Sequence, residues 1–161
     1  MKGIAMTFLT AEEFVGIVDK RYSALILYAR SWNVDAAEDL VQDAFLKLVE
    51  QPKRPENPMA WLCKTIRNAA ISRHRKTERD RKHETAAARQ KPDWFVPNDT
   101  LPAMEAAEKL AELPSQQREI VVLRIWNQLS FDEIAELMGT PKTSVFRMYG
   151  EALQELRRKL S

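Results

Sequence analysis

The chain has 161 residues, enough for one compact domain or two small ones, and its 45% hydrophobic residues with only four glycines favour an all-α fold. The formal net charge of +2 neither demands nor excludes a nucleic-acid partner, so the placement of the charge matters more than its sum. The single cysteine excludes an internal disulfide.

The absence of a cleavable signal or long apolar run predicts a cytoplasmic protein without membrane insertion. The two histidines lack partners at ligand spacing, so we expect no metal and no cofactor.

The first fifty residues predict two helices. Thr10 and Glu13 have the spacing of a capping box, and apolar residues then recur at helical spacing, which predicts a helix from about Ala11 to Ser31. Asp35 and Glu38 repeat the cap signal before a second helix. Its apolar stripe consists of Leu40, Val41, Ala44, Phe45, Leu48 and Val49.

A third helix is predicted after a loop with three prolines between Gln51 and Pro58. Asn57 is the expected N-cap and Pro58 the first helical residue. The helix begins with apolar residues and then becomes strongly basic. Residues 64–91 hold ten Lys and Arg against three acidic residues, whereas residues 1–50 hold five against eight.

The sequence between the two predicted domains is irregular, because three prolines between residues 86 and 102 prevent a continuous helix. We therefore expect a first domain over residues 1–85, a linker over 86–102 and a second domain over 103–161. Trp94 and Phe95 interrupt this linker, and whether they dock on a domain or on a partner stays open.

The second domain is predicted to consist of short helices. One ends at Pro114, Ser115 is the expected cap of another that carries Ile120, Leu123 and Trp126, and a final helix opens at Thr140 and Pro141 and reaches Leu160. Between them, Ser130 and Glu133 form a capping box before a helix over residues 131–138.

Residues 130–145 have the spacing of a helix-turn-helix. Ala135 is small enough for two helices to cross, Gly139 suits the turn, and Val145 would face inward. This predicts DNA binding through the outward residues Lys142, Thr143, Phe146 and Arg147. Two alternatives stay open: a tight helix pair without DNA binding, and a Phe146 that packs on the first domain or the linker.

The polar face of the second predicted helix is acidic and would repel DNA, so it fits a basic protein partner. An ordinary solvated helix face is the alternative. The face carries Glu38, Asp39, Gln42, Asp43 and Lys47.

Three motifs resemble the extracytoplasmic-function group of bacterial sigma factors, in the same order and over nearly the whole chain. "AAEDLVQDAFLKLVE" from Ala36 is similar to that family's polymerase-binding helix, and "NPMAWLCKTIRNAAISRHRK" from Asn57 to its promoter-melting helix. "LPSQQREIVVLRIWNQLSFDEIAELMG" from Leu113 resembles the start of its upstream-element-binding domain. The resemblance implies a chain that gives core RNA polymerase its promoter specificity.

The resemblance also implies roles for residues of the first domain. The face with Asp39, Gln42, Asp43 and Lys47 would dock on the helical coiled coil of the polymerase clamp. Residues at the start and middle of the third helix would hold an unpaired base of the downstream promoter element, namely Asn57, Trp61, Arg67 and Asn68. Basic residues further on would contact phosphates, namely Arg73, Arg75, Lys76 and Arg79. Trp61 has a core-packing alternative.

The recognition helix "TPKTSVFRMYGEAL" departs from the family pattern. Phe146, Met148, Gly150 and Glu151 occupy positions where family members commonly carry basic residues, so Lys142 and Arg147 are its main cations. Binding of an upstream promoter element is therefore in question.

The sequence offers no catalytic nucleophile, acid–base pair or phosphate loop, so we do not expect an enzyme. Two rival functions stay open beside the sigma factor. One rival is a helix-turn-helix regulator that binds duplex DNA as a dimer without polymerase. The other is an adaptor that binds only proteins. The resemblance adds an anti-sigma factor as a further candidate partner.

Overall fold

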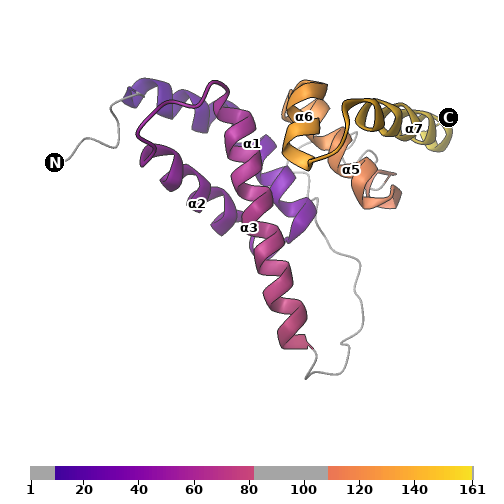
Figure 1. The fold of residues 1–161 in the computed structure, drawn as a ribbon, viewed down its shortest axis with the longest axis horizontal. Coiled ribbons are helices and arrows are strands. Elements are labelled where there is room, and N and C mark those ends of the chain that lie inside the picture. Colours follow the sequence, from indigo (N-terminus) through magenta and orange to yellow (C-terminus); the bar gives the residue numbers. More distant parts are fainter. Residues whose placement is uncertain (1–9, 82–108, 161) are drawn as a thin grey trace. The chain divides into compact units, whose positions relative to one another are not determined.

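The computed structural model describes residues 10–81 and 109–160, and every regular element in these ranges is a helix. The chain divides into two compact units, residues 1–94 and 95–161 (Figure 1). The predicted all-α fold with two small helical domains is therefore confirmed. The predicted linker, its boundaries and the pair Trp94 and Phe95 lie outside the described residues.

The first unit is formed by α1 (Ala11–Trp32), α2 (Ala37–Val49) and α3 (Pro58–Arg81), each of which packs on the other two. The α2 stripe is buried as its spacing predicts except at its last member, Val49, which is partly exposed, and Val41 and Leu48 are fully inaccessible. The largest fully buried side chains of this unit are Leu25, Tyr28, Val41, Leu48, Leu62 and Ile66. Burial of these apolar surfaces holds the three helices together.

The starts of α1 and α2 differ in how well the sequence predicts them. Thr10 caps α1 as expected, because its Oγ1 accepts a hydrogen bond from the Glu13 N–H at 3.0 Å. The cap predicted at Asp35 is wrong, since the N-cap of α2 is Ala36 and makes no side-chain cap bond. Asn33 Oδ1 accepts from the Ala36 N–H at 3.1 Å instead, which holds residues 34–36 in a turn and delays the helix.

The two halves of α3 have different surroundings. Its first part packs in the core through Leu62, Cys63, Ile66 and Ala70. Residues 72–79 are exposed on every side, and this basic half extends past the ends of α1 and α2 (Figure 1). The sequence explains the change, because apolar residues end near Ile71 and charged ones follow.

The second unit contains α5 (Ser115–Val121), η2 (Val122–Trp126), α6 (Phe131–Met138) and α7 (Lys142–Leu160), and residues 109–112 are also helical. Its core is formed by fully or almost fully buried apolar side chains of all these segments. They include Leu110, Leu113, Ile120, Val121, Val122, Leu123, Leu129, Ile134, Val145 and Ala152.

The segment from Ser115 to Trp126 departs from the predicted regular helix at both ends. Pro114 is the N-cap and Ser115 is already helical, so Ser115 does not cap α5. The extended backbone of Pro114 lets its carbonyl accept the first helical bond, from the Arg118 N–H at 2.9 Å. The last turn, η2, is π-helical, with the Asn127 N–H donating to the Val122 carbonyl at 3.1 Å.

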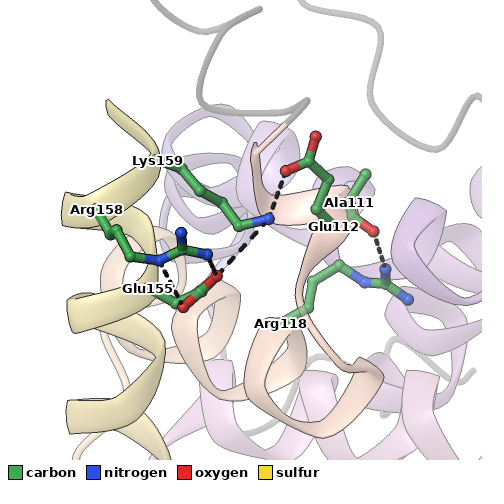
Figure 2. Close-up of polar contacts among 6 residues, drawn as sticks. All are labelled: Ala111, Glu112, Arg118, Glu155, Arg158 and Lys159. Atoms are coloured by element: carbon green, nitrogen blue, oxygen red, sulfur yellow. Dashed lines mark hydrogen bonds and ion pairs between the residues drawn. The ribbon is translucent and has the colours of Figure 1, made fainter. Parts of the chain in front are cut away.

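Polar contacts join residues 109–112 to the helices that follow (Figure 2). Arg118 of α5 donates a hydrogen bond from a guanidinium NH to the Ala111 carbonyl at 3.3 Å. Partial burial lowers the pKa of Arg118 below its ordinary value, and the attraction of the neighbouring Glu119 carboxylate only partly offsets this effect. The short helical segment is thus fixed to α5 by its backbone as well as by its apolar residues.

Candidate functional site

The outer face of α2 is exposed and acidic, as the sequence predicts. The apolar stripe turns toward α1 and α3, which leaves the polar residues in solvent. All the residues expected to bind the polymerase are exposed on it: Asp39, Gln42, Asp43 and Lys47. The structure therefore brings this set together on one helix.

The same face holds an apolar residue that the sequence reasoning missed. Leu46 is 60% exposed, although its neighbours Phe45 and Leu48 are buried. Leu46 follows Gln42 by four residues and Asp43 by three, which places it on the polar face of the helix. This spacing is the signal that could have found it.

The start of α3 is fixed by Asn57. Its Oδ1 accepts hydrogen bonds from the N–H groups of Met59, at 3.0 Å, and Ala60, at 3.2 Å, which confirms the predicted cap. Trp61, one turn into the helix, is half-buried and so compatible with both roles considered for it.

A pocket of about 710 Å³ lies beside this cap, between the start of α1 and the loop before α3. Its lining combines charged residues of both signs with Asn57 and Met59. Arg54 and Glu13 meet there in an ion pair with NH1 and Oε2 at 3.0 Å, and both side chains stay about half exposed. The pocket is a shallow depression open to solvent, and a depression of this size can accept a small ring.

Arg67 and Asn68, both expected to touch an unpaired base, have different surroundings. Arg67 is half-buried, and its guanidinium carbon lies 5.6 Å from the centroid of the Trp32 ring on α1. Such a contact stabilises both side chains by a cation–π attraction. Asn68 is exposed. The residues expected to meet phosphates, Arg73, Arg75, Lys76 and Arg79, are all exposed on the projecting half of α3.

The helix-turn-helix in the second unit is formed by α6 and α7, with the turn at the predicted glycine. Ser130 and Glu133 form both bonds of the capping box, at 3.1 and 2.8 Å. Gly139 has φ +63°, a left-handed conformation that favours glycine, and Val145 is fully buried. These three sequence predictions are confirmed.

The outward face of α7 carries the four residues expected to meet DNA, and all of them are exposed: Lys142, Thr143, Phe146 and Arg147. Phe146 is 63% exposed and makes an edge contact with Phe131 at 5.3 Å between ring centroids. Phe131 also meets Tyr149 at 5.2 Å, and the Arg124 guanidinium lies 4.6 Å from the Phe131 ring centroid. An aromatic cluster therefore fixes one side of this face.

Both cations of this face are ion-paired. Lys142 Nζ lies 3.2 Å from Asp132 Oδ1 at the start of α6, and Arg147 NH1 lies 2.7 Å from Glu151 Oε1 one turn along α7. These pairs were not foreseen from the sequence.

The described part of the chain offers no group of three or more His, Cys, Asp or Glu side chains able to hold a metal ion. Cys63 is buried in the first unit and forms no disulfide. Among the helices described, none is long and apolar enough to cross a bilayer.

Comparisons with known proteins agree with this geometry. Residues 17–80 match the family described as Sigma-70 region 2, and residues 103–156 match Sigma-70, region 4. The RNA polymerase sigma-E factor of Streptomyces avermitilis is 30% identical over 158 residues, covering 92% of this chain and 85% of that protein. The ECF RNA polymerase sigma factor SigW of Bacillus subtilis is 26% identical over 158 residues, covering 88% and 83%.

Two solved structures have a similar fold. The sigma factor RpoE of Bartonella quintana, in complex with the anti-sigma factor NepR, aligns with a TM-score of 0.74 over 93% of this chain and 98% of that chain, at 24% identity. CnrH, in complex with the cytosolic domain of CnrY, aligns with a TM-score of 0.60 over 98% and 92%, at 26% identity.

Proposed function

The chain belongs to the extracytoplasmic-function family of RNA polymerase sigma factors, and we propose that its first unit binds core polymerase and one melted DNA strand while its second unit binds duplex DNA upstream. Promoter recognition by this chain depends on polymerase. The regulator that acts on duplex DNA alone is not favoured, because both units match sigma regions.

The docking surface that we propose for polymerase is the outer face of α2. Asp39 and Asp43 attract a basic partner surface, and Gln42 adds a hydrogen-bonding group beside them. Leu46, 60% exposed among them, supplies the apolar anchor that such a charged surface otherwise lacks. In such a patch the carboxylates attract a basic partner from a distance, and the apolar surface of Leu46 is removed from water when the partner binds.

For the melted strand we propose a surface that runs along α3, from the pocket beside its first residues to its projecting basic half. Exposed cations on α3 meet phosphates, which gives an affinity that falls with salt. The pocket beside Asn57, of about 710 Å³, takes an unpaired base, and Asn68 hydrogen-bonds a base edge. Arg67 supports this surface from its position over Trp32.

In this proposal binding free energy alone separates the strands, so the chain performs no catalytic step of its own. It acts with polymerase in the cytoplasm. Capturing a base costs a few kcal/mol of unstacking, which the phosphate and base contacts offset. An anti-sigma factor is the further partner that we propose. Its support is the Bartonella relative, which was solved with one bound.

The observation that carries the proposal is the presence of two exposed surfaces of opposite charge on one three-helix unit, on α2 and on the projecting half of α3. The test is transcription by purified core polymerase with the full chain on fragmented genomic DNA, with the start sites sequenced. We expect defined start sites that core polymerase alone does not use. If the chain adds no start site, the proposal is wrong.

A further inference from the structure

We propose that Glu151 is a built-in counter-ion of the recognition helix, which lowers the affinity of the second unit for duplex DNA by neutralising Arg147. The inference rests on the proposed function of this unit and identifies a residue that sets its affinity. Asp132 has the same relationship to Lys142 on the other side of the turn.

The contact between Arg147 and Glu151 is a hydrogen-bonded ion pair on exposed helix surface. NH1 of Arg147 donates to Oε1 of Glu151 at 2.7 Å, and the two side chains are 64% and 45% exposed. The guanidinium is therefore accessible to a phosphate or a guanine edge, but one of its donors is already used.

Glu151 also has a polar neighbour on a second helix. Gln117 Nε2 of α5 lies 3.5 Å from its other carboxylate oxygen, Oε2, at the outer limit of a hydrogen bond. The carboxylate thus has a neighbour on α5 as well as its ion pair with Arg147 on α7.

The same face has no surplus of positive charge. Between residues 142 and 156 the sequence contains two basic residues, Lys142 and Arg147. Lys142 Nζ lies 3.2 Å from Asp132 Oδ1, so each of these cations has a carboxylate beside it.

The energies involved explain how this arrangement lowers affinity without abolishing it. An exposed ion pair is worth about 0.2–1 kcal/mol, so a phosphate can displace Glu151 from Arg147. The displaced carboxylate then remains close to the DNA backbone. Because Arg147 and Glu151 together have no net charge, they release no counter-ion from the DNA. Each phosphate neutralised changes the slope of log affinity against log salt by about 0.9, so removing the carboxylate steepens that slope.

The experiment measures binding of the full chain to a fluorescent mixed-sequence DNA duplex by anisotropy at several salt concentrations. Glu151→Gln is expected to bind more tightly than the wild type, with a slope steeper by about 0.9. Between about 50 and about 200 mM salt, the affinity of this variant then changes by about 3.5-fold more than that of the wild type. Circular dichroism checks that each variant is folded.

Two further variants separate the counter-ion effect from net charge. Glu155→Gln makes the same charge change one turn further along α7, where the carboxylate pairs with Arg158, and is expected to leave the slope unchanged. Adding Arg147→Ala to Glu151→Gln is expected to remove the gain. Equal slopes for the wild type and Glu151→Gln, an equal gain in Glu155→Gln, or a gain that survives Arg147→Ala would each overturn the inference.

Absence of binding by all these proteins at low salt would overturn it as well. The proposed function is tested by a different experiment, the transcription assay with core polymerase and the wild-type chain. The two can therefore fail independently.

Discussion

Lys159 Nζ lies 2.6 Å from Glu112 Oε2, so the last turn of α7 is joined to the residues that precede α5 (Figure 2). The Lys159 side chain is 20% exposed, less than the 47% of Glu112, and its ammonium also lies 3.9 Å from Glu155 Oε1. This contact joins the two ends of the part of the second unit that the structure describes, residues 109–160.

We predict that Glu112→Gln or Lys159→Met lowers the free energy of opening of α7 by at most about 1 kcal/mol, the range of partly exposed ion pairs. The double variant should lose little more than either single variant, because both remove the same contact. Amide hydrogen exchange of α7 measures this loss. Fully additive losses would show that the two residues act independently.

Acid should weaken the same end of the unit. Hydrogen bonding from Arg158 lowers the pKa of Glu155 below its ordinary value of 4.5, although partial desolvation opposes this shift. The carboxylate therefore adds stability above pH 4.5, and this contribution is lost as the pH falls through the pKa of the folded state.

Thermal unfolding against pH tests this prediction. In Glu155→Gln the decline of the melting temperature below pH 4.5 should be shallower than in the wild type. Glu136→Gln, which removes an exposed carboxylate of α6, is the control. Parallel profiles of wild type and Glu155→Gln would contradict the prediction.

Two glycines of the helix-turn-helix unit should respond in opposite directions to alanine. A Cβ added at Gly139 or Gly150 meets nothing within 4 Å, so neither substitution creates a clash. Gly139→Ala should destabilise the unit by about 1–2 kcal/mol, because φ there is +63°. Gly150→Ala, inside α7, should stabilise it by about 0.5–1 kcal/mol. Unfolding by denaturant measures both changes in stability. A change of the same sign in both variants would contradict the prediction.

Local signals in the sequence predict much of this fold, because their partners lie within a few residues. The Ser130 and Glu133 capping box and the Asn57 cap are of this kind. The prediction of the α2 cap fails for a related reason. Asn33 and Asp35 both suit a cap, and the hydrogen bond that the Ala36 N–H donates to Asn33 Oδ1 decides where the helix begins.

Contacts between helices could not be predicted in this way. The π-helical turn over Val122–Trp126 replaces a regular helix although the apolar spacing suits both. The position of Arg67 over Trp32, and the contact of Glu151 with Gln117, depend on how the helices pack. The exposed sites were predictable as surfaces, whereas the pairing of their charges was not.

Charge reversal on α2 should weaken polymerase binding. In Asp43→Arg a positive charge replaces the exposed carboxylate of the proposed docking surface, so we expect at least a tenfold loss of affinity for core polymerase, equivalent to about 1.4 kcal/mol. Asp19→Arg, an identical change on the exposed surface of α1, should bind as the wild type does. Similar losses in both variants would indicate an effect of net charge rather than a docking site.

Substitutions on α3 should impair promoter opening more than polymerase binding. Asn68→Ala removes an exposed amide and should reduce opening without loss of stability. Arg67→Ala should reduce opening too, but with some destabilisation, because it also removes the contact with Trp32. Fluorescence of unpaired bases and affinity for core polymerase are measured on the same samples. An equal fall of both quantities would argue against a role in holding the melted strand.

The most direct test of the central claim combines both surfaces of the first unit in one measurement. A fluorescent base analogue is placed in the downstream element of a promoter found by start-site mapping, and its signal follows strand separation. We predict that the signal rises only when core polymerase and the chain are both present. No rise with both, or the same rise with core polymerase alone, would contradict the claim that this small helical unit holds polymerase and separated DNA together.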